Sequence, residues 1–380
     1  MTGGAVEIVP VESKAVLSEF IALPKRLLTD DPHWIAPLDL ERRQVYSPGG
    51  SVFMRRAEVK LWIARRGGRT VGRISAQIDP LDAAGLTEGA GQFGSLAAID
   101  DADVFSALLE TAEGFLKERG KRMARGPFTL SINDESGLLI DGFETPPMIM
   151  MGHDPRYAGL RMEGAGYTKA QDLHAFLIDL EKEPTRLARA ALERPPINTV
   201  HLRPLDMARY EDEVKLIVSI FNDAWSNNWG FVPMTEDETQ ELADRLRPLI
   251  RSELGVFADV GGVPAGFILA LPNLNEAIHD LDGRLLPFGW AKLLYRLKLQ
   301  GLETARVALM GVRRSLHGSV TGSAIPFHLI GRLWRAIRPL GYRHVELSWI
   351  LESNVAMRRL LEGLGATTYK TYRVYEKTLT

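Results

Sequence analysis

The chain of 380 residues contains no cysteine. This absence excludes disulfide bonds, zinc sites built on thiolates and covalent catalysis by a cysteine nucleophile. An excess of charge of one sign is also missing, because 46 Lys and Arg residues face 48 Asp and Glu residues and leave a formal net charge of -2. Nucleic-acid-binding proteins rely on a strongly positive field, so this balance argues against a globally basic DNA binder.

Long hydrophobic runs are missing as well. The longest uncharged stretch, residues 260–275, is interrupted by glycine and proline and is shorter than the ~20 apolar residues that a membrane-spanning helix needs. The N-terminal residues lack the charged start and apolar stretch of a secretory signal, and Thr2 stands where N-myristoylation requires glycine. We therefore expect no transmembrane helix and a cytoplasmic location.

The composition is that of a globular protein, with 45% hydrophobic and 25% charged residues, and the length suggests two domains. Residues 61–76 resemble residues 255–270, and each segment has the pattern of two strands joined by a Gly-Gly turn. The tetrapeptide 163–166, Glu-Gly-x-Gly, recurs at 362–365. We interpret the halves as structural duplicates; a chance likeness of two hairpins is the alternative.

A proline-rich segment at 183–198 separates the halves and is predicted to be a linker with one short helical stretch. The predicted domains are 1–182 and 199–380. Helical and strand patterns alternate within each half, which predicts an α+β fold. The clearest of these patterns fall at 102–119, 305–312, 326–339 and 344–351.

The second half carries a recognisable order: an apolar strand, a polar loop with glycine (RRSLHGSVTGS), a helix, a second strand and then Asn354. From Asn354 onward, NVAMRRLLEGLGA resembles the Asn-x-x-Ala-x-x-Leu-Tyr-x-Lys-x-Gly-Phe motif of the GNAT superfamily of N-acyltransferases, with Leu360 and Gly365 matching. Met357, Leu361 and Ala366 replace the alanine, tyrosine and phenylalanine of the motif. The resemblance covers most of 199–380 and implies two tandem GNAT-like domains, each a mixed, mostly antiparallel sheet flanked by helices.

A glycine-containing loop that opens a helix suits the pyrophosphate of coenzyme A, because free amides and the helix dipole favour an anion. The loop does not follow the usual GNAT pattern, and an ordinary strand-to-helix turn with solvated arginines is the alternative. The candidate residues for acyl-CoA binding are Met310, Gly311, Val312, Arg313, Arg314, Gly318, Ser319, Thr321, Gly322, Ser323 and Asn354.

Direct transfer from a thioester needs a backbone amide for the carbonyl, expected around 310–312, and a general base. Strand alternation places Glu346 and Glu352 on one polar face, and both are candidates, with His317 as a third. Surface carboxylates are the alternative for either glutamate. The tyrosine that commonly protonates the thiolate in GNAT enzymes is replaced by Leu361, so that role is vacant or belongs to Tyr369, Tyr372 or Tyr375. The histidines lack ligand spacing, and we predict no metal site.

The first half has the same expected order of strands and helices, but it lacks the residues expected to bind coenzyme A. Asp100, Asp101 and Asp103 lie where a phosphate would sit, and carboxylates repel an anion. Pro155 stands at the position that corresponds to Asn354. We therefore expect coenzyme A to bind only the second half, and the first half to be structural or to shape the substrate site.

Several stretches across the chain, among them NNWGFVPMTEDE, ELSWILESN and YKTYRVYEK, resemble the tandem-GNAT proteins of Gram-negative bacteria that include the bacterial ceramide synthases. The resemblance implies acyl-CoA-dependent N-acylation of a long-chain amine, most plausibly a sphingoid base. A Fem-like transferase that uses aminoacyl-tRNA and a degenerate scaffold that binds a lipid or a protein are the alternatives.

An insertion at 277–303 carries one amphipathic segment, residues 285–300. Its predicted helix has one apolar face with three cations nearby, which is typical of helices that lie on a membrane surface. Packing against the rest of the protein is the alternative. The face comprises Leu286, Trp290, Leu293, Leu294 and Leu297, and the cations are Lys292, Arg296 and Lys298.

Overall fold

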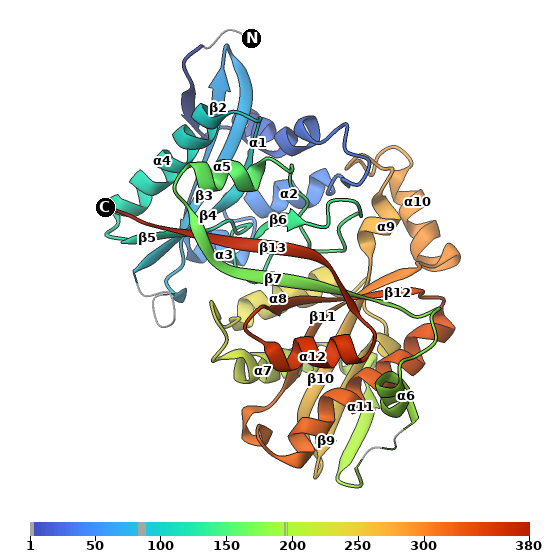
Figure 1. Cartoon of the computed structure of the whole chain (residues 1–380). Coiled ribbons are helices and arrows are strands. Elements are labelled where there is room, and N and C mark those ends of the chain that lie inside the picture. The colour runs from blue at the N-terminus through green and yellow to red at the C-terminus, as the bar shows by residue number, and fades with distance from the viewer. Residues whose placement is uncertain (1–3, 83–88, 194, 196) are drawn as a thin grey trace. The chain divides into compact units, whose positions relative to one another are not determined.

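The computed structural model describes residues 4–82, 89–193, 195 and 197–380 (Figure 1). The chain forms two compact units. Unit 1 comprises Met1–Leu173, Ile278–Gly289 and Lys370–Thr380, and unit 2 comprises His174–Ala277 and Trp290–Tyr369. The linear division at 183–198 therefore needs correction in three places. The first boundary lies between Leu173 and His174, and part of the insertion and the last eleven residues of the chain belong to unit 1.

Unit 1 is a sheet with helices. Its strand order is β1-β2-β3-β4-β5-β13-β7, with β6 paired to β13, and β4 and β5 form a parallel pair. The strands are β1 (Glu7–Pro10), β2 (Glu58–Arg66), β3 (Arg69–Ile78), β4 (Ala90–Ala98), β5 (Met123–Gly126), β6 (Leu138–Asp141), β7 (Thr168–Asp179) and β13 (Thr367–Thr378). The residues of β7 from His174 onward and the first three residues of β13 belong to unit 2. The helices are α1 (Lys14–Leu27), α2 (Asp39–Tyr46), α3 (Val52–Arg56), α4 (Ala102–Glu118) and α5 (Ala158–Gly164).

Unit 2 repeats this plan with the strand order β7-β12-β11-β10-β9-β8, in which β11 and β12 are parallel. Its strands are β8 (Val200–Pro204), β9 (Gly255–Val260), β10 (Val263–Pro272), β11 (Thr304–Val312) and β12 (His344–Leu351). Its helices are α6 (Arg186–Glu193), α7 (Tyr210–Trp225), α8 (Glu236–Leu246), α9 (Leu274–Ile278), α10 (Gly289–Tyr295), α11 (Val320–Ile337) and α12 (Val355–Gly363).

The internal repeat is a pair of hairpins, β2–β3 and β9–β10. Both turns are Gly-Gly, and all four glycines have positive φ, between 55° at Gly67 and 83° at Gly262. Such turns match the right-handed twist of the flanking strands, and glycine adopts them without strain. Each half then continues with a strand, a helix, a parallel strand, a helix and a long final strand, so the predicted tandem α+β architecture is confirmed.

The final strand of the second half explains the correction to the domain division. β13 pairs antiparallel with β5, with Tyr375 opposite Gly126 and Lys377 opposite Ala124. β5 therefore obtains its second neighbour from the end of the chain, which lies far away in the sequence. Pairing between strands so distant in sequence leaves no local signal.

The core of unit 2 lies between the sheet and α11. Leu329, Leu333 and Ile337 of α11 belong to one buried cluster with sheet residues such as Val307 and Val345. The sequence pattern predicted this helix from Pro326, but it begins at Val320. The Ser319 side chain caps the earlier start by accepting the N–H of Gly322 at 2.9 Å.

Candidate active site

The parallel pairing of β11 with β12 is short. It runs from Thr304 opposite His344 to Val307 opposite Leu347 in the part of the chain that the structure describes, whereas the two strands continue to Val312 and Leu351. Beyond Val307, the pairing that the structure describes for β11 is with β10. One edge of β11 is thus available from Ala308 onward, and the candidate site is built around this edge.

At alternate residues of β11, the backbone N–H and C=O groups point away from β10 and toward this edge. Arg313 N–H donates to Ala265 O at 2.8 Å, so this is a hydrogen-bonded pair of the antiparallel ladder. Because such pairs alternate, the N–H and C=O groups of Met310 and Val312 point away from β10. The indole of Trp225 donates to the Met310 carbonyl at 3.0 Å, and His317 Nε2 lies 3.0 Å from the Val312 carbonyl.

A buried polar cluster lies where the pairing of β11 and β12 stops. Arg306 and Glu346 are directly opposite each other in the register, and Ser348 is the second residue after Glu346. The three residues are 2%, 0% and 4% exposed, respectively. The fourth member, Tyr369 near the start of β13, is partly exposed and donates its hydroxyl to Glu346 Oε2.

The two oxygens of the Glu346 carboxylate have different partners. Oε1 accepts the Ser348 hydroxyl at 2.6 Å and lies 3.3 Å from Arg306 Nε. Oε2 accepts the Tyr369 hydroxyl. Arg306 Nε donates to Ser348 Oγ at 2.8 Å, and its Nη2 donates to the Ser348 carbonyl at 3.2 Å. A buried charge requires such partners, and here the carboxylate is reached from the partly exposed side through the phenol of Tyr369.

The loop that leads from β11 to α11 is anchored to α7. Arg314 N–H donates to Asp223 Oδ2 at 2.8 Å, and Arg314 Nη1 donates to Ser226 Oγ at 2.6 Å. Arg313 contacts the Pro264 carbonyl and Ser219 Oγ at 3.1 and 3.2 Å. Both guanidinium groups thus have partners in unit 2, and their predicted contact with phosphate stays a prediction.

The start of α11 has no acidic side chain in its first turn. Ser319 Oγ accepts from Gly322 N–H, and the Ser319 carbonyl accepts the N–H and the hydroxyl of Ser323. The N–H groups of the first helical turn, from Val320 and Thr321, have no intrahelical acceptor by geometry. Gly322 fits because a Cβ there would meet the Leu316 carbonyl at 2.0 Å, and Gly318 adopts φ +77°.

The remaining predicted residues lie apart from the buried cluster. Asn354 caps α12, and its Oδ1 accepts Met357 N–H at 3.1 Å. Glu352 follows the end of β12 and is partly exposed, whereas Glu346 is fully buried, so the alternative of a surface carboxylate is wrong for Glu346. Tyr372 and Tyr375 belong to unit 1, so Tyr369 is the one of the three candidate tyrosines that lies with Glu346.

The equivalent place in unit 1 is filled by the chain itself. The pairing of β4 with β5 ends at Gln92 opposite Arg125, and Phe128 N–H then donates to Phe93 O at 2.9 Å. A Cβ on Gly94 would lie 1.5 Å from the Phe128 carbonyl. The segment after β5 therefore packs directly on the β4 edge, where β11 in unit 2 has its available edge.

The start of α4, the corresponding helix of unit 1, also differs from the start of α11. Asp101 caps α4 by accepting from Asp103 N–H and Val104 N–H, and its carboxylate forms an ion pair with Arg66 at 2.6 Å. A negative side chain thus occupies the position where α11 has the neutral Ser319. Asp100 pairs with Arg161 at 2.8 Å. Carboxylates at this helix start repel a phosphate group.

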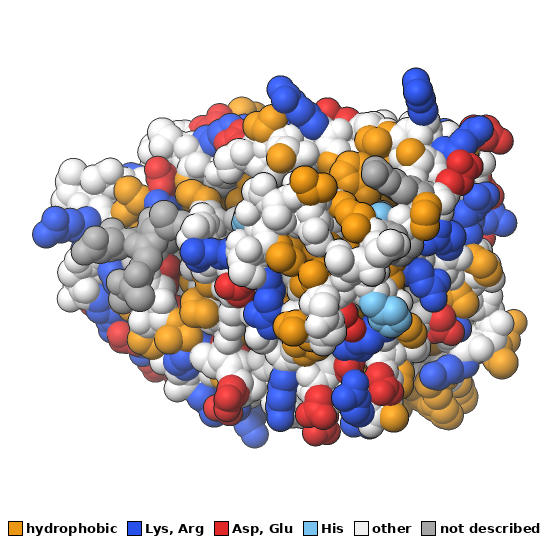
Figure 2. Space-filling model, turned by 90° about the horizontal axis from the view of Figure 1, so that it is seen from below, with side chains coloured by type: hydrophobic (Ala, Val, Ile, Leu, Met, Phe, Trp, Pro, Cys, Tyr) orange, Lys and Arg blue, Asp and Glu red, His pale blue; other side chains and the backbone are white. Residues whose placement is uncertain are grey.

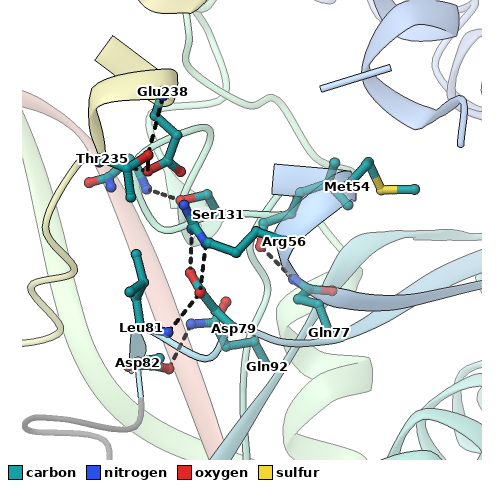
Figure 3. Close-up of polar contacts among 12 residues, drawn as sticks. Met54, Arg56, Gln77, Asp79, Leu81, Asp82, Gln92, Ser131, Thr235 and Glu238 are labelled. Atoms are coloured by element: carbon teal, nitrogen blue, oxygen red, sulfur yellow. Dashed lines mark hydrogen bonds and ion pairs between the residues drawn. The ribbon is translucent and has the colours of Figure 1, made fainter. Parts of the chain in front are cut away.

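A further ion pair with neighbouring polar contacts lies in unit 1. Arg56 of α3 and Asp79 after β3 point toward each other and form contacts of 2.7 and 3.1 Å (Figure 3). Asp79 also accepts Leu81 N–H, and Gln92 donates to Asp82 at 2.8 Å. Gln77 donates to the Leu130 carbonyl at 2.9 Å and holds the segment after β5. These contacts have a structural role.

Sequence reasoning missed Arg306 and Ser348. A signal existed, because Arg306 is a charged residue within an otherwise apolar strand. Reading that signal requires the register that places Arg306 opposite Glu346, and the register follows only from the folded sheet. Across the residues that the structure describes, no group of three or more His, Asp or Glu side chains is arranged to hold a metal ion.

Comparison with solved structures identifies the fold class. A tandem GNAT protein from the clavulanic acid biosynthesis pathway aligns with a TM-score of 0.57 at 13% identity, covering 99% of both chains. A GCN5-related N-acetyltransferase from Sphaerobacter thermophilus aligns with a TM-score of 0.55 at 15% identity, covering 98% of this chain and 96% of that one. The protein is thus of the tandem-GNAT class.

Sequence relatives narrow the class to a family. A bacterial ceramide synthase of Caulobacter vibrioides is 50% identical over 380 residues, which is all of this chain and 99% of the relative. Protein YghO of Escherichia coli K12 is 43% identical and covers 96% of this chain and 93% of its own length. No family model matches the chain. The chain belongs to the tandem-GNAT family of the bacterial ceramide synthase, and it is an N-acyltransferase.

Proposed function

We propose that the protein transfers an acyl group from acyl-CoA to the amino group of a long-chain amine, with a sphingoid base as the acceptor and a ceramide or ketoceramide as the product. The observation that carries the proposal is the difference between the two units. Unit 2 has an available β11 edge beside a neutral helix start, and unit 1 has the same place filled by Phe128 and capped by Asp101.

Coenzyme A would bind unit 2 along this edge. The outward N–H of Met310 or Val312 suits the thioester carbonyl or the pantetheine amides. The first-turn amides of α11 suit the pyrophosphate, with Gly318, Ser319, Thr321, Gly322 and Ser323 in the loop. Arg313 and Arg314 lie at the same end of β11 and supply positive charge. Gly311 allows α7 to approach, because a Cβ there would lie 3.2 Å from Ala224 Cβ.

We infer the acceptor from the name of the sequence relative and from the aromatic side chains near β11. The relative with 50% identity is named a bacterial ceramide synthase. The indole of Trp225 donates to the Met310 carbonyl. Its ring centroid lies 4.9 Å from that of Phe221, and the ring centroids of Phe221 and Phe231 are 5.7 Å apart. These aromatic rings supply an apolar wall beside the β11 edge that suits a hydrocarbon chain.

Peripheral membrane contact is the second part of the proposal, because a long-chain amine and its acylated product partition into lipid. No helix among the described residues is long and apolar enough to span a membrane. In unit 2, Trp290, Leu294, Tyr295 and Leu299 are 51%, 49%, 56% and 78% exposed, with Lys292 and Lys298 exposed among them. We place this surface at the cytoplasmic face of the inner membrane.

The predicted helix over 285–300 needs correction here. The structure has α10 from Gly289 to Tyr295 and then a π-helical turn from Arg296 to Gln300. Leu293 and Leu297 pack on the core of unit 2.

The face of the molecule seen in Figure 2 mixes Lys and Arg with Asp and Glu side chains, in agreement with a net charge near zero.

The test is incubation of the protein with palmitoyl-CoA and either sphinganine or its 3-keto form, followed by thiol detection and mass analysis of the lipid. We expect thiol release that requires both substrates and an N-acylated product. Release without any amine preference would refute the acceptor assignment. Salt-sensitive binding of tRNA together with no use of acyl-CoA would instead favour a Fem-like aminoacyl transferase.

A further inference from the structure

We propose that Tyr369 is a catalytic residue that carries the proton from the attacking amine to Glu346 and back to the departing thiolate. The inference rests on the proposed acyltransfer and names the proton path within it. Its basis is the juxtaposition of a partly exposed phenol, a fully buried carboxylate and the point where β11 loses its β12 neighbour.

Burial excludes direct contact of Glu346 with a substrate. The residue has 0% exposure, and Oε1 is held by Ser348 and Arg306. Oε2 is the other oxygen, and Tyr369 donates its hydroxyl to it. Because the other three members of the cluster are buried, Tyr369 is the member through which an incoming group reaches the carboxylate.

The phenol is oriented for this task. Its hydroxyl donates to Glu346 Oε2, so the phenol lies between the partly exposed side of the cluster and the buried carboxylate. Ser348 helps to hold the carboxylate in place. The shorter guanidinium contact, 2.8 Å, goes to the Ser348 hydroxyl, and the contact to Glu346 is 3.3 Å. The arginine therefore fixes the carboxylate mainly through the serine.

The step balances without a further reactant. The neutral amine attacks the thioester carbonyl and the C–N bond forms. The N–H proton passes to the Tyr369 oxygen as the phenol proton passes to Glu346 Oε2. The C–S bond then breaks, and the return of a proton from Glu346 through Tyr369 leaves coenzyme A as the free thiol. The proton lost by nitrogen ends on sulfur, which provides the function that the tyrosine of the GNAT motif would have at Leu361.

The experiment compares Tyr369→Phe, Glu346→Gln and the double variant with the wild type, using palmitoyl-CoA and sphinganine. Tyr210→Phe is the matched control, because it removes a phenol hydroxyl that bonds the Ala243 carbonyl elsewhere in unit 2. General acid–base catalysis contributes ~100-fold to ~10,000-fold, so we expect Tyr369→Phe to lower kcat at least ~100-fold while KM for acyl-CoA and binding of coenzyme A are unchanged.

Two readouts separate a relay from mere structural support. The double variant should be no slower than the slower single variant, because residues that act as one unit are not additive. Glu346→Asp, which retains a carboxylate, should recover part of the rate that Glu346→Gln loses. Additive losses, or a Tyr369→Phe variant with wild-type kcat, would overturn the relay alone. A wild-type protein that releases no thiol with any long-chain amine would overturn the proposed function and the relay together. Tyr369→Phe removes one partly exposed hydroxyl, so it stays informative if Glu346→Gln fails to fold.

Discussion

Ser348 stands between Arg306 and Glu346: its hydroxyl accepts from Arg306 Nε at 2.8 Å and donates to Glu346 Oε1 at 2.6 Å. The serine keeps the two charges 3.3 Å apart at their nearest recorded contact and takes the shorter hydrogen bond itself. It thus sets how strongly Arg306 restrains Glu346.

Ser348→Ala tests this role. Without the hydroxyl, Glu346 Oε1 and Arg306 Nε each lose a hydrogen-bond partner in a buried cluster, and we expect kcat to fall by about tenfold or more with unchanged KM because the carboxylate is no longer held in position. Steady-state kinetics with palmitoyl-CoA and a long-chain amine provide the measurement. Ser348→Thr retains the hydroxyl and should recover most of the rate. Equal rates for Ser348→Ala and wild type would contradict the role.

The cluster also shows what a sequence alone permits. The hairpins, β11, β12 and the cap at Asn354 follow from local patterns, namely alternation, Gly-Gly turns and a polar residue before a helix. Glu346 was a candidate for the same local reason. Its burial and its contacts with Arg306 and Tyr369 depend on strand register and on where β13 begins, and neither is encoded within a short window.

The N-terminal caps of α11 and α4 differ by one charge, and this difference provides a second experiment. Ser319→Asp gives α11 the type of cap that Asp101 gives α4. Asp caps a helix as well as Ser does, so stability should be retained, but the carboxylate repels the pyrophosphate. We expect about tenfold weaker coenzyme A binding by calorimetry. Ser319→Asn is the neutral control and should bind normally; equal loss in both variants would contradict an electrostatic cause.

The two arginines of the loop are tested together. In Arg313→Ala/Arg314→Ala the loop keeps its backbone contacts, Arg313 N–H to Ala265 O and Arg314 N–H to Asp223, each at 2.8 Å. Hydrogen bonds to charged groups contribute ~1.5–3 kcal/mol, so the loss of phosphate contacts should weaken acyl-CoA binding at least tenfold without unfolding. Arg335→Ala/Arg338→Ala, at the far end of α11, is the control. Unchanged affinity in the loop variant would reject this part of the site.

Asp154 in unit 1 makes stability depend on pH in an unusual direction. Burial raises the pKa of Asp154 to about 7, although its Oδ2 accepts Leu139 N–H at 2.9 Å. Between pH ~4 and pH 7 the unfolded state is ionised at this residue while the folded state keeps its proton. The contribution of Asp154 to stability therefore falls as pH rises through this window and levels off above pH 7.

Asp154→Asn removes that contribution. In urea unfolding measured from pH 4 to pH 8, the difference in unfolding free energy between variant and wild type should grow with pH by up to a few kcal/mol, at ~1.4 kcal/mol per unit of pKa shift. Asp206→Asn is the control, because backbone hydrogen bonding to Ala208 lowers the pKa of Asp206, so the effect of this substitution should change little between about pH 5 and pH 8. A difference that is constant across this pH range would show that Asp154 ionises normally in the folded protein.

The exposed apolar surface of α10 and the following turn is the basis of the last prediction. Burial at a lipid interface contributes ~25 cal/mol per Å², and each cation near anionic lipid adds ~1 kcal/mol. We expect the protein to sediment with vesicles of phosphatidylethanolamine and phosphatidylglycerol and to be released by salt. Trp290→Ser/Leu294→Ser should weaken this binding at least tenfold, since a side chain of this size contributes ~1.5–3 kcal/mol when fully buried.

Two controls distinguish membrane docking from other roles of Trp290 and Leu294. Leu160→Ser removes a leucine that is 73% exposed in unit 1 and should leave vesicle binding unchanged. Leu293 and Leu297, which pack on the core, are kept, so the double variant should fold and should still acylate a water-soluble short-chain amine. If the double variant sediments with vesicles as the wild type does, the surface has another partner. If it loses turnover of the short-chain amine as well, the residues act in the site and membrane docking is not their role.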